Sequence, residues 1–199
     1  MPGMTATQPT VERLHFTGDD EADRLLASDP LALLIGFALD QQVSVQKAFS
    51  GPAELRRRIG HLNAARIAAM DPEELAAAFR ERPALHRFPG AMAARVQALC
   101  AYLVAHYDGD ASRVWTDASD GRDLQARLLA LPSIGDMKAR SLIAILGKRF
   151  GVQVPGLDEV MPTHPTLGDV DSAEALARDR KSTRLNSSHE VPSRMPSSA

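Results

Sequence analysis

Apolar residues recur every three or four positions through most of this chain, the spacing that places them on one face of an α-helix. The stretch DPLALLIGFALDQQVSV (29–45) begins with Asp29 as a natural N-cap and Pro30 in the first turn, where a missing N–H costs nothing. Four other segments show the same period: DDEADRLLASD (19–29), FPGAMAARVQALCAYLVAHY (88–107), DLQARLLAL (123–131) and DMKARSLIAILGKRF (136–150). Each segment therefore predicts an amphipathic helix.

Ala and Leu dominate the sequence, and runs of β-branched residues are short. Such a composition favours helices over strands, so we predict an all-α protein of about nine short helices with tight connections. The periodic part of the chain predicts one helical domain over residues 19–178. Residues 1–18 are polar and predict a flexible N-terminal arm.

The segment DRKSTRLNSSHEVPSRMPSSA (179–199) shows no apolar periodicity. Residues 179–189 can be encoded by DNA that resembles a common short-read sequencing adaptor, and residues 192–199 by the far end of the same adaptor. Two matches in one frame and in the right order indicate adaptor read-through, so we exclude this segment from the predicted fold. Without it, the 23 basic and 25 acidic residues of the chain become 19 and 23, which is a net charge of −4.

The composition excludes several classes of protein. A net charge of −2 argues against general binding of nucleic acid, although local phosphate contacts depend on charge distribution rather than on the sum. The single cysteine excludes a disulfide framework and a cysteine cluster for zinc or iron–sulfur, and we expect no metal and no organic cofactor. No apolar run is long enough to span a membrane, and the first residues do not resemble a signal peptide. We therefore expect a cytoplasmic protein.

The break between the last two periodic segments, LPSIGDMKA (131–139), is the strongest candidate for function. Pro132 ends the first helix. Before the second helix, Gly135 permits either a left-handed backbone conformation or the close approach of another group to the backbone. The second helix then offers unpaired N–H groups and the positive end of its dipole to an anion such as a DNA phosphate. Lys138 and Arg140 can reach the same strand. An ordinary αα-corner is an equally good explanation of the pattern.

Three segments, taken in order, resemble one known family. LPSIGDMKA is similar to a helix–hairpin–helix in which Leu-Pro-Gly-(Val/Ile)-Gly is usual, with Ser133 here replacing the first hairpin Gly. LLIGFALDQQVSVQKA (33–48) and FPGAMAARVQAL (88–99) are similar to an early helix and to the helix before the hairpin. The family is the HhH-GPD superfamily of base-excision DNA repair glycosylases, and the QQVSV stretch most resembles its 3-methyladenine glycosylase II branch. The resemblance covers residues 30–162.

This resemblance implies an all-α fold with two helical lobes around a cleft. It also implies a nucleoid-associated protein whose partner is double-stranded DNA with a damaged base, which is flipped out of the helix and excised. The DNA contacts that it implies are Ser133, Ile134 and Gly135 in the hairpin and Lys138 and Arg140 in the helix after it.

The same family places an essential Asp just beyond the helix that follows the hairpin. In this chain PGLDEVMP (155–162) occupies that region, and Asp158 follows Met137 by 21 residues. A carboxylate there would stabilise the developing sugar cation or orient the attacking water. Asp158 is therefore the expected catalytic residue and Glu159 the second choice. Both are also compatible with solvated loop acids.

Met137 distinguishes between two types of glycosylase. Relatives that also cleave the DNA backbone carry a Lys two residues after the last hairpin Gly, and its amine forms a Schiff base with the sugar. Met137 occupies that position here, so the resemblance implies a monofunctional glycosylase that uses water as the nucleophile. Alkylated purines are the favoured substrates, because a base that already carries positive charge needs little acid assistance to leave. A monomer is expected.

Gln41 and Gln42 end an apolar helix, where a polar pair is unusual. The resemblance implies that one of them enters the DNA near the vacated base, while a hydrogen-bonded helix end is nearly as good an explanation. Two alternatives to an enzyme also stay open. One is a non-catalytic helix–hairpin–helix module that only binds DNA, and the other is a helical adaptor that binds proteins.

Overall fold

The computed structural model describes residues 11–178, and within this range the chain forms helices and loops without any strand. The α-helices are α1 (Asp20–Ser28), α2 (Pro30–Leu39), α3 (Val45–Ile59), α4 (Ala64–Ala69), α5 (Pro72–Arg80), α6 (Pro89–Tyr107), α7 (Arg113–Thr116), α8 (Gly121–Ala130), α9 (Asp136–Lys148) and α10 (Leu157–Val160). A 3₁₀ helix, η1 (Leu167–Asp169), follows them. The predicted all-α fold is confirmed. None of the helices in this range is both long and apolar enough to cross a membrane.

Helix α2 forms the centre of the molecule. Every residue from Leu31 to Leu39 is buried, as expected for a helix that is apolar on all sides. Asp29 caps it, since its Oδ1 accepts from the backbone N–H groups of Leu31 (2.9 Å) and Ala32 (3.3 Å). The helix ends at Leu39, earlier than the sequence pattern indicated, so the polar residues that follow lie in a turn beyond it.

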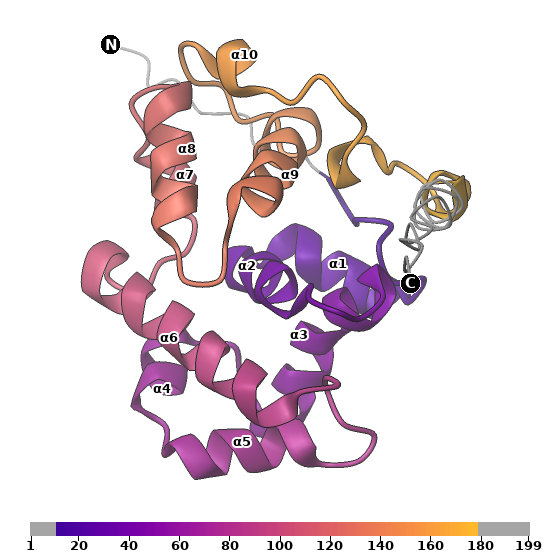
Figure 1. Ribbon diagram of the computed structural model, residues 1–199, viewed down its shortest axis with the longest axis vertical. Helices are drawn as coiled ribbons and strands as arrows, with labels where there is room; N and C mark the ends of the chain where they lie inside the picture. The colour runs from indigo at the N-terminus through magenta and orange to yellow at the C-terminus, as the bar shows by residue number, and fades with distance from the viewer. Residues whose placement is uncertain (1–10, 179–199) are drawn as a thin grey trace, which may run out of the picture.

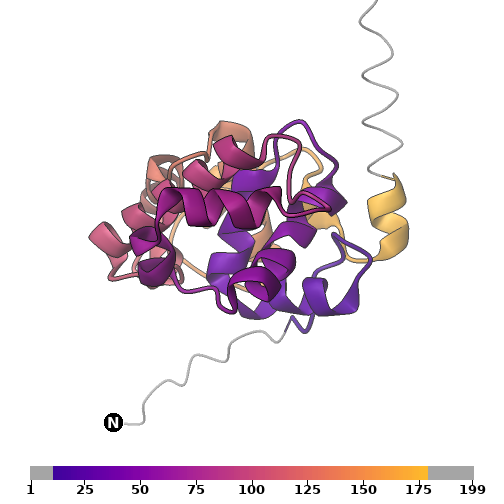
Figure 2. The same ribbon diagram turned by 90° about the horizontal axis from the view of Figure 1, so that it is seen from below.

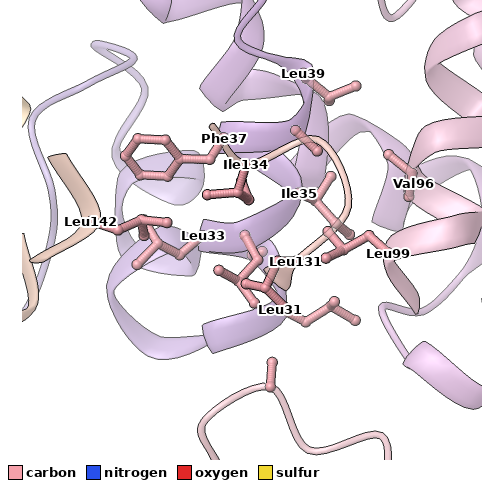
Figure 3. Close-up of a cluster of buried hydrophobic side chains, with 14 of the residues drawn as sticks. Leu31, Leu33, Ile35, Phe37, Leu39, Val96, Leu99, Leu131, Ile134 and Leu142 are labelled. Carbon is pink, nitrogen blue, oxygen red and sulfur yellow. The ribbon is translucent and has the colours of Figure 1, made fainter. Parts of the chain in front are cut away.

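Two groups of helices pack around α2 (Figure 1). Helix α3 packs on α2, and α6 packs on α2, α4 and α5, which gives one group. Helices α7 to α10 form the other, with α8 packed on α7, α9 and α10. Figure 3 shows α2 side chains reaching Val96 and Leu99 of α6 on one side and Leu142 of α9 on the other. The core is therefore continuous across both groups.

The first described residues, from 11 onward, are packed against the helices, so the flexible arm predicted for residues 1–18 does not extend over this part of it. Leu14 and Phe16 are fully buried, and the Phe16 ring meets the Phe49 ring edge-on with centroids 5.0 Å apart. The buried Asp23 carboxylate accepts from the backbone N–H groups of Phe16 (3.1 Å) and Thr17 (2.9 Å). Two buried apolar side chains and the Asp23 carboxylate, which accepts from the backbone, thus fix this segment. Residues 1–10 and the predicted adaptor segment 179–199 lie outside the described range.

A buried arginine holds the loop 81–88, which joins α5 to α6. The Arg58 side chain, on α3, is only 3 % exposed. Its guanidinium donates to the carbonyls of Ala78 (2.7 Å), Glu81 (2.9 Å) and Pro83 (2.6 Å), and it pairs with Glu54 at 2.8 Å. Such charge-assisted bonds to several carbonyls fix the path of a loop that has no regular structure.

The end of the described chain packs back on both groups. Helix α10 contacts the N-terminal end of α8, where the Gly121 N–H donates to Pro155 O at 2.8 Å. η1 lies on α9, and Arg149 Nε donates to Gly168 O at 2.9 Å. The last described residues then return to the side of the molecule that α1 occupies (Figure 2), where Leu176 is buried.

Two surface hollows lie away from the hairpin. One, of about 510 Å³, is lined by α1, α3 and the loop at Pro83 and Leu85. The other, of about 340 Å³, lies between the N-terminal end of α8 and the segment around the start of α10.

Candidate functional site

The hairpin between α8 and α9 is anchored in the core by two of its own side chains. Leu131 is 2 % exposed and Ile134 is 5 % exposed. Figure 3 shows both lying over α2 among Leu33, Ile35 and Phe37. Because the Ile134 side chain is buried, only its backbone is free to contact a ligand. The buried side chains of Leu131 and Ile134 therefore hold the hairpin firmly against α2.

The left-handed position in the hairpin is Ser133, so of the two conformations that Gly135 permits, left-handed or close approach, the left-handed one is not adopted. Ser133 has φ +69°, whereas Gly135 is extended with φ −91° and ψ −177°. An L-residue in the left-handed region costs about 1 kcal/mol or more, and such strain often occurs at functional sites. A Cβ added to Gly135 would meet no atom within 4 Å. This open space leaves room for a ligand to approach the Gly135 backbone closely, which is the other possibility that the sequence indicated.

The N-terminus of α9 lacks the cap that most helices here receive. Asp29 and Ser44, for example, cap α2 and α3 with their side chains, but among the described residues no side chain caps α9. Gly135, Asp136 and Met137 are all exposed, and Met137 is 72 % exposed. The N–H groups of the first turn and the positive end of the helix dipole are therefore accessible to an anion from outside.

The two basic residues of this helix already have partners in the protein. The half-buried Lys138 Nζ donates to the Ser133 carbonyl at 3.3 Å, so it braces the hairpin from inside rather than extending into solvent. Arg140 Nε pairs with Asp136 Oδ2 at 2.9 Å, and both side chains remain exposed. Of the two, only Arg140 is placed to reach a strand at the surface.

The two glutamines after α2 have different environments. Gln42 is exposed and has φ +54°, a second non-glycine residue in the left-handed region. Gln41 is half-buried, and its side-chain oxygen accepts from Arg95 of α6. Gln41 is thus held in place, and Gln42 is the one that can extend away from the protein.

A buried histidine holds the turn that carries these glutamines. His86 is 2 % exposed, and its Nδ1 accepts from the Phe88 N–H at 3.0 Å. The proton of the neutral ring therefore lies on Nε2, which is 3.0 Å from the carbonyls of both Leu39 and Gln41 and donates to them. Burial lowers the pKa of His86, which favours this neutral form. His86 fixes the backbone on both sides of residue 40.

Asp40 lies inside this turn, and the sequence analysis did not select it. Its side chain is half-buried, and burial raises the pKa of the carboxyl while the positive charge of Lys138 opposes that rise. Burial lowers the pKa of Lys138, and Asp40 opposes that shift in turn. The charges of Asp40 and Lys138 therefore influence each other, although no ion pair within 4 Å joins them in residues 11–178.

Asp158 and Glu159, the expected catalytic acids, lie elsewhere. Both are exposed on α10, and Glu159 pairs with Arg122 of α8 at 3.1 Å. Helix α10 packs against the C-terminal half of α9, where Gly147 faces Leu157. The thirteen residues of α9 span about 20 Å, so these acids lie roughly one helix length from the hairpin (Figure 1). The structure does not bring them together with the other site residues.

Asp40, His86 and Arg95 were not selected as site residues from the sequence, and they differ in how far the sequence pointed to them. Asp40 directly follows an entirely apolar helix and precedes two glutamines, an unusual place for a charge. His86 is a lone histidine, which gave little signal. Arg95 lies in FPGAMAARVQAL, a segment that resembles the helix before the hairpin, but no contact was assigned to it. Their joint position depends on packing between α2, the loop 81–88 and α6, and periodicity does not report that packing.

The comparisons with known proteins give one result. The family model described as HhH-GPD superfamily base excision DNA repair protein matches residues 35–195, which is most of the chain. A search of curated proteins found no match. The matched region contains the hairpin, α2 from Ile35 onward, and all the helices between them. The chain therefore belongs to the HhH-GPD superfamily of base excision DNA repair proteins.

Proposed function

We propose that this protein is a monofunctional DNA glycosylase that hydrolyses the bond between a damaged base and its sugar. The observation that carries the proposal is the N-terminus of α9, which is uncapped, exposed and open above Gly135 in a member of a base excision repair family. A DNA phosphate would accept hydrogen bonds from the N–H groups of this turn. Ser133 and Gly135 would contribute backbone contacts, while Arg140 would lie along the same strand.

The turn after α2 supplies the second contact with DNA in this proposal. Gln42 would enter the duplex near the vacated base, since it is the exposed member of the pair, and Gln41 would support the turn through Arg95. Removing a base from the stack costs a few kcal/mol, and a side chain that fills the gap offsets part of that cost. The protein would act on duplex DNA as a monomer.

The absence of strand cleavage follows from one position in this proposal. Met137 is exposed at the place where bifunctional relatives carry an amine, and a thioether cannot form a Schiff base. Water would therefore attack the sugar. Alkylated bases that already carry a positive charge are the substrates we favour, because they leave without protonation.

The test uses the full chain with labelled duplexes that each carry one lesion: a methylated purine, uracil or hypoxanthine. Each reaction is divided and developed with and without hot alkali, which cuts the strand at an abasic site. We expect cleavage only after alkali, and only for the alkylated base. Cleavage without alkali would show that the interpretation of Met137 is wrong.

A second candidate function is a binding module that has lost the chemistry. The position of Asp158 and Glu159, about a helix length from the hairpin, favours it. The two functions differ in the assay above, because a module would bind duplexes in a salt-dependent way and release no base from any lesion. A protein-binding adaptor would show neither base release nor salt-dependent DNA binding.

A further inference from the structure

The basic side chains of this protein differ in whether a carboxylate neutralises them. Most of those within residues 11–178 form an ion pair within 4 Å, as Arg56 does with Glu21 at 3.1 Å. Lys47 in the first turn of α3, Arg87 in the loop before α6 and Arg95 on α6 are exposed, and none of them forms such a pair in this range. In a chain with a net negative charge, exposed and unpaired cations are candidates for contact with an anionic partner.

Hydrogen bonds place Lys47 and Arg95 close to one buried histidine. Lys47 Nζ donates to the Ala84 carbonyl at 2.7 Å, and Arg95 donates to the side-chain oxygen of Gln41. His86 joins these two points, because it follows Ala84 by two residues and its Nε2 lies 3.0 Å from the Gln41 carbonyl. Burial lowers the pKa of His86, and the charges of Lys47 and Arg95 lower it further. The two cations therefore lie where the loop with His86 meets the turn after α2.

Arg87 completes this group and is held by an aromatic ring. Its guanidinium carbon lies 5.3 Å from the centroid of the Phe88 ring, and Phe88 is 41 % exposed. The Phe88 backbone is fixed in turn, since its N–H donates to His86 Nδ1 at 3.0 Å. We call Lys47, Arg87 and Arg95 the basic patch. An ammonium has three N–H donors and a guanidinium five, so the patch keeps most of its donors available for another acceptor.

The basic patch and the hairpin lie on different groups of helices, with the turn after α2 beside both. The hairpin joins α8 and α9, whereas the patch lies on α3, α6 and the loop between α5 and α6. Gln42 is the exposed residue of the turn, and Arg95 holds the neighbouring Gln41. Lys138 bonds the hairpin carbonyl of Ser133 at 3.3 Å; burial lowers the pKa of Lys138, and the charge of Arg95 lowers it further. The turn that carries Gln42 is therefore bordered by the hairpin in one group of helices and by the basic patch in the other.

A DNA duplex offers two backbones to a surface of this kind. Together they carry one negative charge for about every 1.7 Å of helix axis. In the proposed function the hairpin contacts one backbone, and Gln42 enters between the two strands. The basic patch, in the other group of helices, then faces the second backbone.

We propose that the basic patch binds the phosphates of the strand opposite the damaged base, so that the protein holds both strands of the duplex. This inference rests on the DNA binding of the proposed function and adds Lys47, Arg87 and Arg95 to its contacts. Phosphate contacts carry no sequence information, so the patch serves affinity and orientation and not the choice of lesion. Positive charge confined to this surface lets a chain with a net negative charge bind a polyanion.

The first test counts phosphate contacts through the salt dependence of binding. Fluorescence anisotropy of the full chain on a duplex with one tetrahydrofuran, which imitates a sugar without its base, gives the affinity at several salt concentrations. Each phosphate contact steepens the slope of log affinity against log salt by about 0.9. Lys47→Gln and Arg87→Gln should therefore each reduce the slope by about one, and the double variant by about two. Lys47→Arg and Arg87→Lys keep the charge and should keep the slope.

Arg66→Gln is the matched control. Arg66 lies on α4, is exposed and forms no ion pair among the described residues, like the members of the patch. Helix α4 is held on another side of α6, because Gln97 donates to the carbonyls of Ile67 (3.2 Å) and Met70 (2.8 Å), and Gln97 and Arg95 lie about 200° apart around the helix. Arg66→Gln should keep the wild-type slope. A reduction as large as that of the patch variants would indicate a general effect of charge and overturn the inference.

The second test assigns the strand. Methylphosphonates replace single phosphates of the tetrahydrofuran duplex by neutral groups, one after another along each strand. We expect substitutions at some positions opposite the tetrahydrofuran to weaken wild-type binding several-fold and to leave the double variant Lys47→Gln/Arg87→Gln unaffected. Substitutions in the strand that carries the tetrahydrofuran should weaken both proteins equally. If the double variant loses its response to that strand instead, the patch binds the wrong strand and the inference is overturned.

Failure of the inference can be told apart from failure of the proposed function. Salt-dependent binding with the same slope in the double variant and in wild type overturns the inference alone, and absence of salt-dependent binding overturns both. Slopes that fall as expected in a protein that releases no base support the inference and favour the binding module. Thermal unfolding checks each variant. If Lys47→Gln loses its bond to Ala84 and unfolds, Arg87→Gln carries the test alone, because the Arg87 side chain bonds no backbone group in residues 11–178.

Discussion

The two helices of the hairpin begin in opposite ways. Helix α8 starts with Asp120 as its cap, whose Oδ1 accepts from the Asp123 N–H at 2.8 Å, and with a buried Gly121. Helix α9 starts at Gly135 with no side-chain cap and open space where a Cβ would be. The N-terminus of α8 is thus capped by a side chain, whereas that of α9 has no side-chain cap and its first N–H groups remain accessible.

Gly121 and Gly135, at the starts of α8 and α9, differ in whether packing within the protein requires glycine. A Cβ on Gly121 would come within 2.8 Å of the Gly156 carbonyl carbon and 2.9 Å of Leu157 Cα, so the packing of α10 requires glycine there. Gly135 has no steric requirement of this kind and an ordinary extended backbone. A glycine that the protein itself does not need is the better indicator of ligand approach.

The largest expected effect is a loss of stability on substitution of Gly121, at the N-terminus of α8. Gly121→Ala should lower the free energy of unfolding by about 1–3 kcal/mol, because backbone atoms must move to admit the methyl group. Urea denaturation measures this, with Gly135→Ala as the matched substitution, which should cost nothing. Similar stability losses in the two variants would remove the distinction between the two ends.

The next effect concerns DNA. Gly135→Ala should weaken duplex binding roughly tenfold, the equivalent of one hydrogen bond to a charged group, while leaving the unfolding midpoint unchanged or slightly higher. Fluorescence anisotropy at several salt concentrations measures the affinity. Unchanged affinity would show that no phosphate approaches Gly135 closely, and would place the DNA contact elsewhere.

The smallest expected effect lies between the two ends, at Ser133. Ser133→Gly should stabilise the protein by about 0.5 kcal/mol, since relief of the left-handed strain exceeds the entropy that glycine loses on folding. Ser133→Ala keeps the strain and is the control, for which no gain is expected. Thermal unfolding of both variants measures the difference, and an equal gain would contradict a backbone origin.

Local pattern was enough to predict α1, α2, α6, α8, α9 and the hairpin, but not the four-residue helices α7 and α10. The spacing of apolar residues and the Asp29–Pro30 start located α2, and the Pro-Ser-Ile-Gly break located the hairpin, because capping and periodicity act over a few residues. The buried Leu14 and Phe16 were missed, since two apolar residues are too few to show a period. The left-handed residue of the hairpin is Ser133, whereas the sequence indicated only that Gly135 permits such a conformation.

The candidate site was less accessible to prediction. Asp158 was chosen by its distance along the chain after Met137, but the chain after α9 turns towards the N-terminal end of α8 and away from the hairpin. Asp40 and Lys138 are nearly 100 residues apart, and their charges influence each other because the hairpin packs on the core that α2 centres. No sequence spacing encodes such proximity.

The complete burial of α2 determines how far apart the segments proposed to contact DNA are held. The end of this helix carries the turn with Asp40 and Gln42, and its side receives Leu131 and Ile134 of the hairpin. The distance between the hairpin and the turn at Gln42, the two segments proposed to contact DNA, is then set by the dense packing of one helix and not by a flexible loop. A substitution that leaves a small cavity beside α2 would therefore disturb the alignment of these two segments on the duplex before it unfolded the protein.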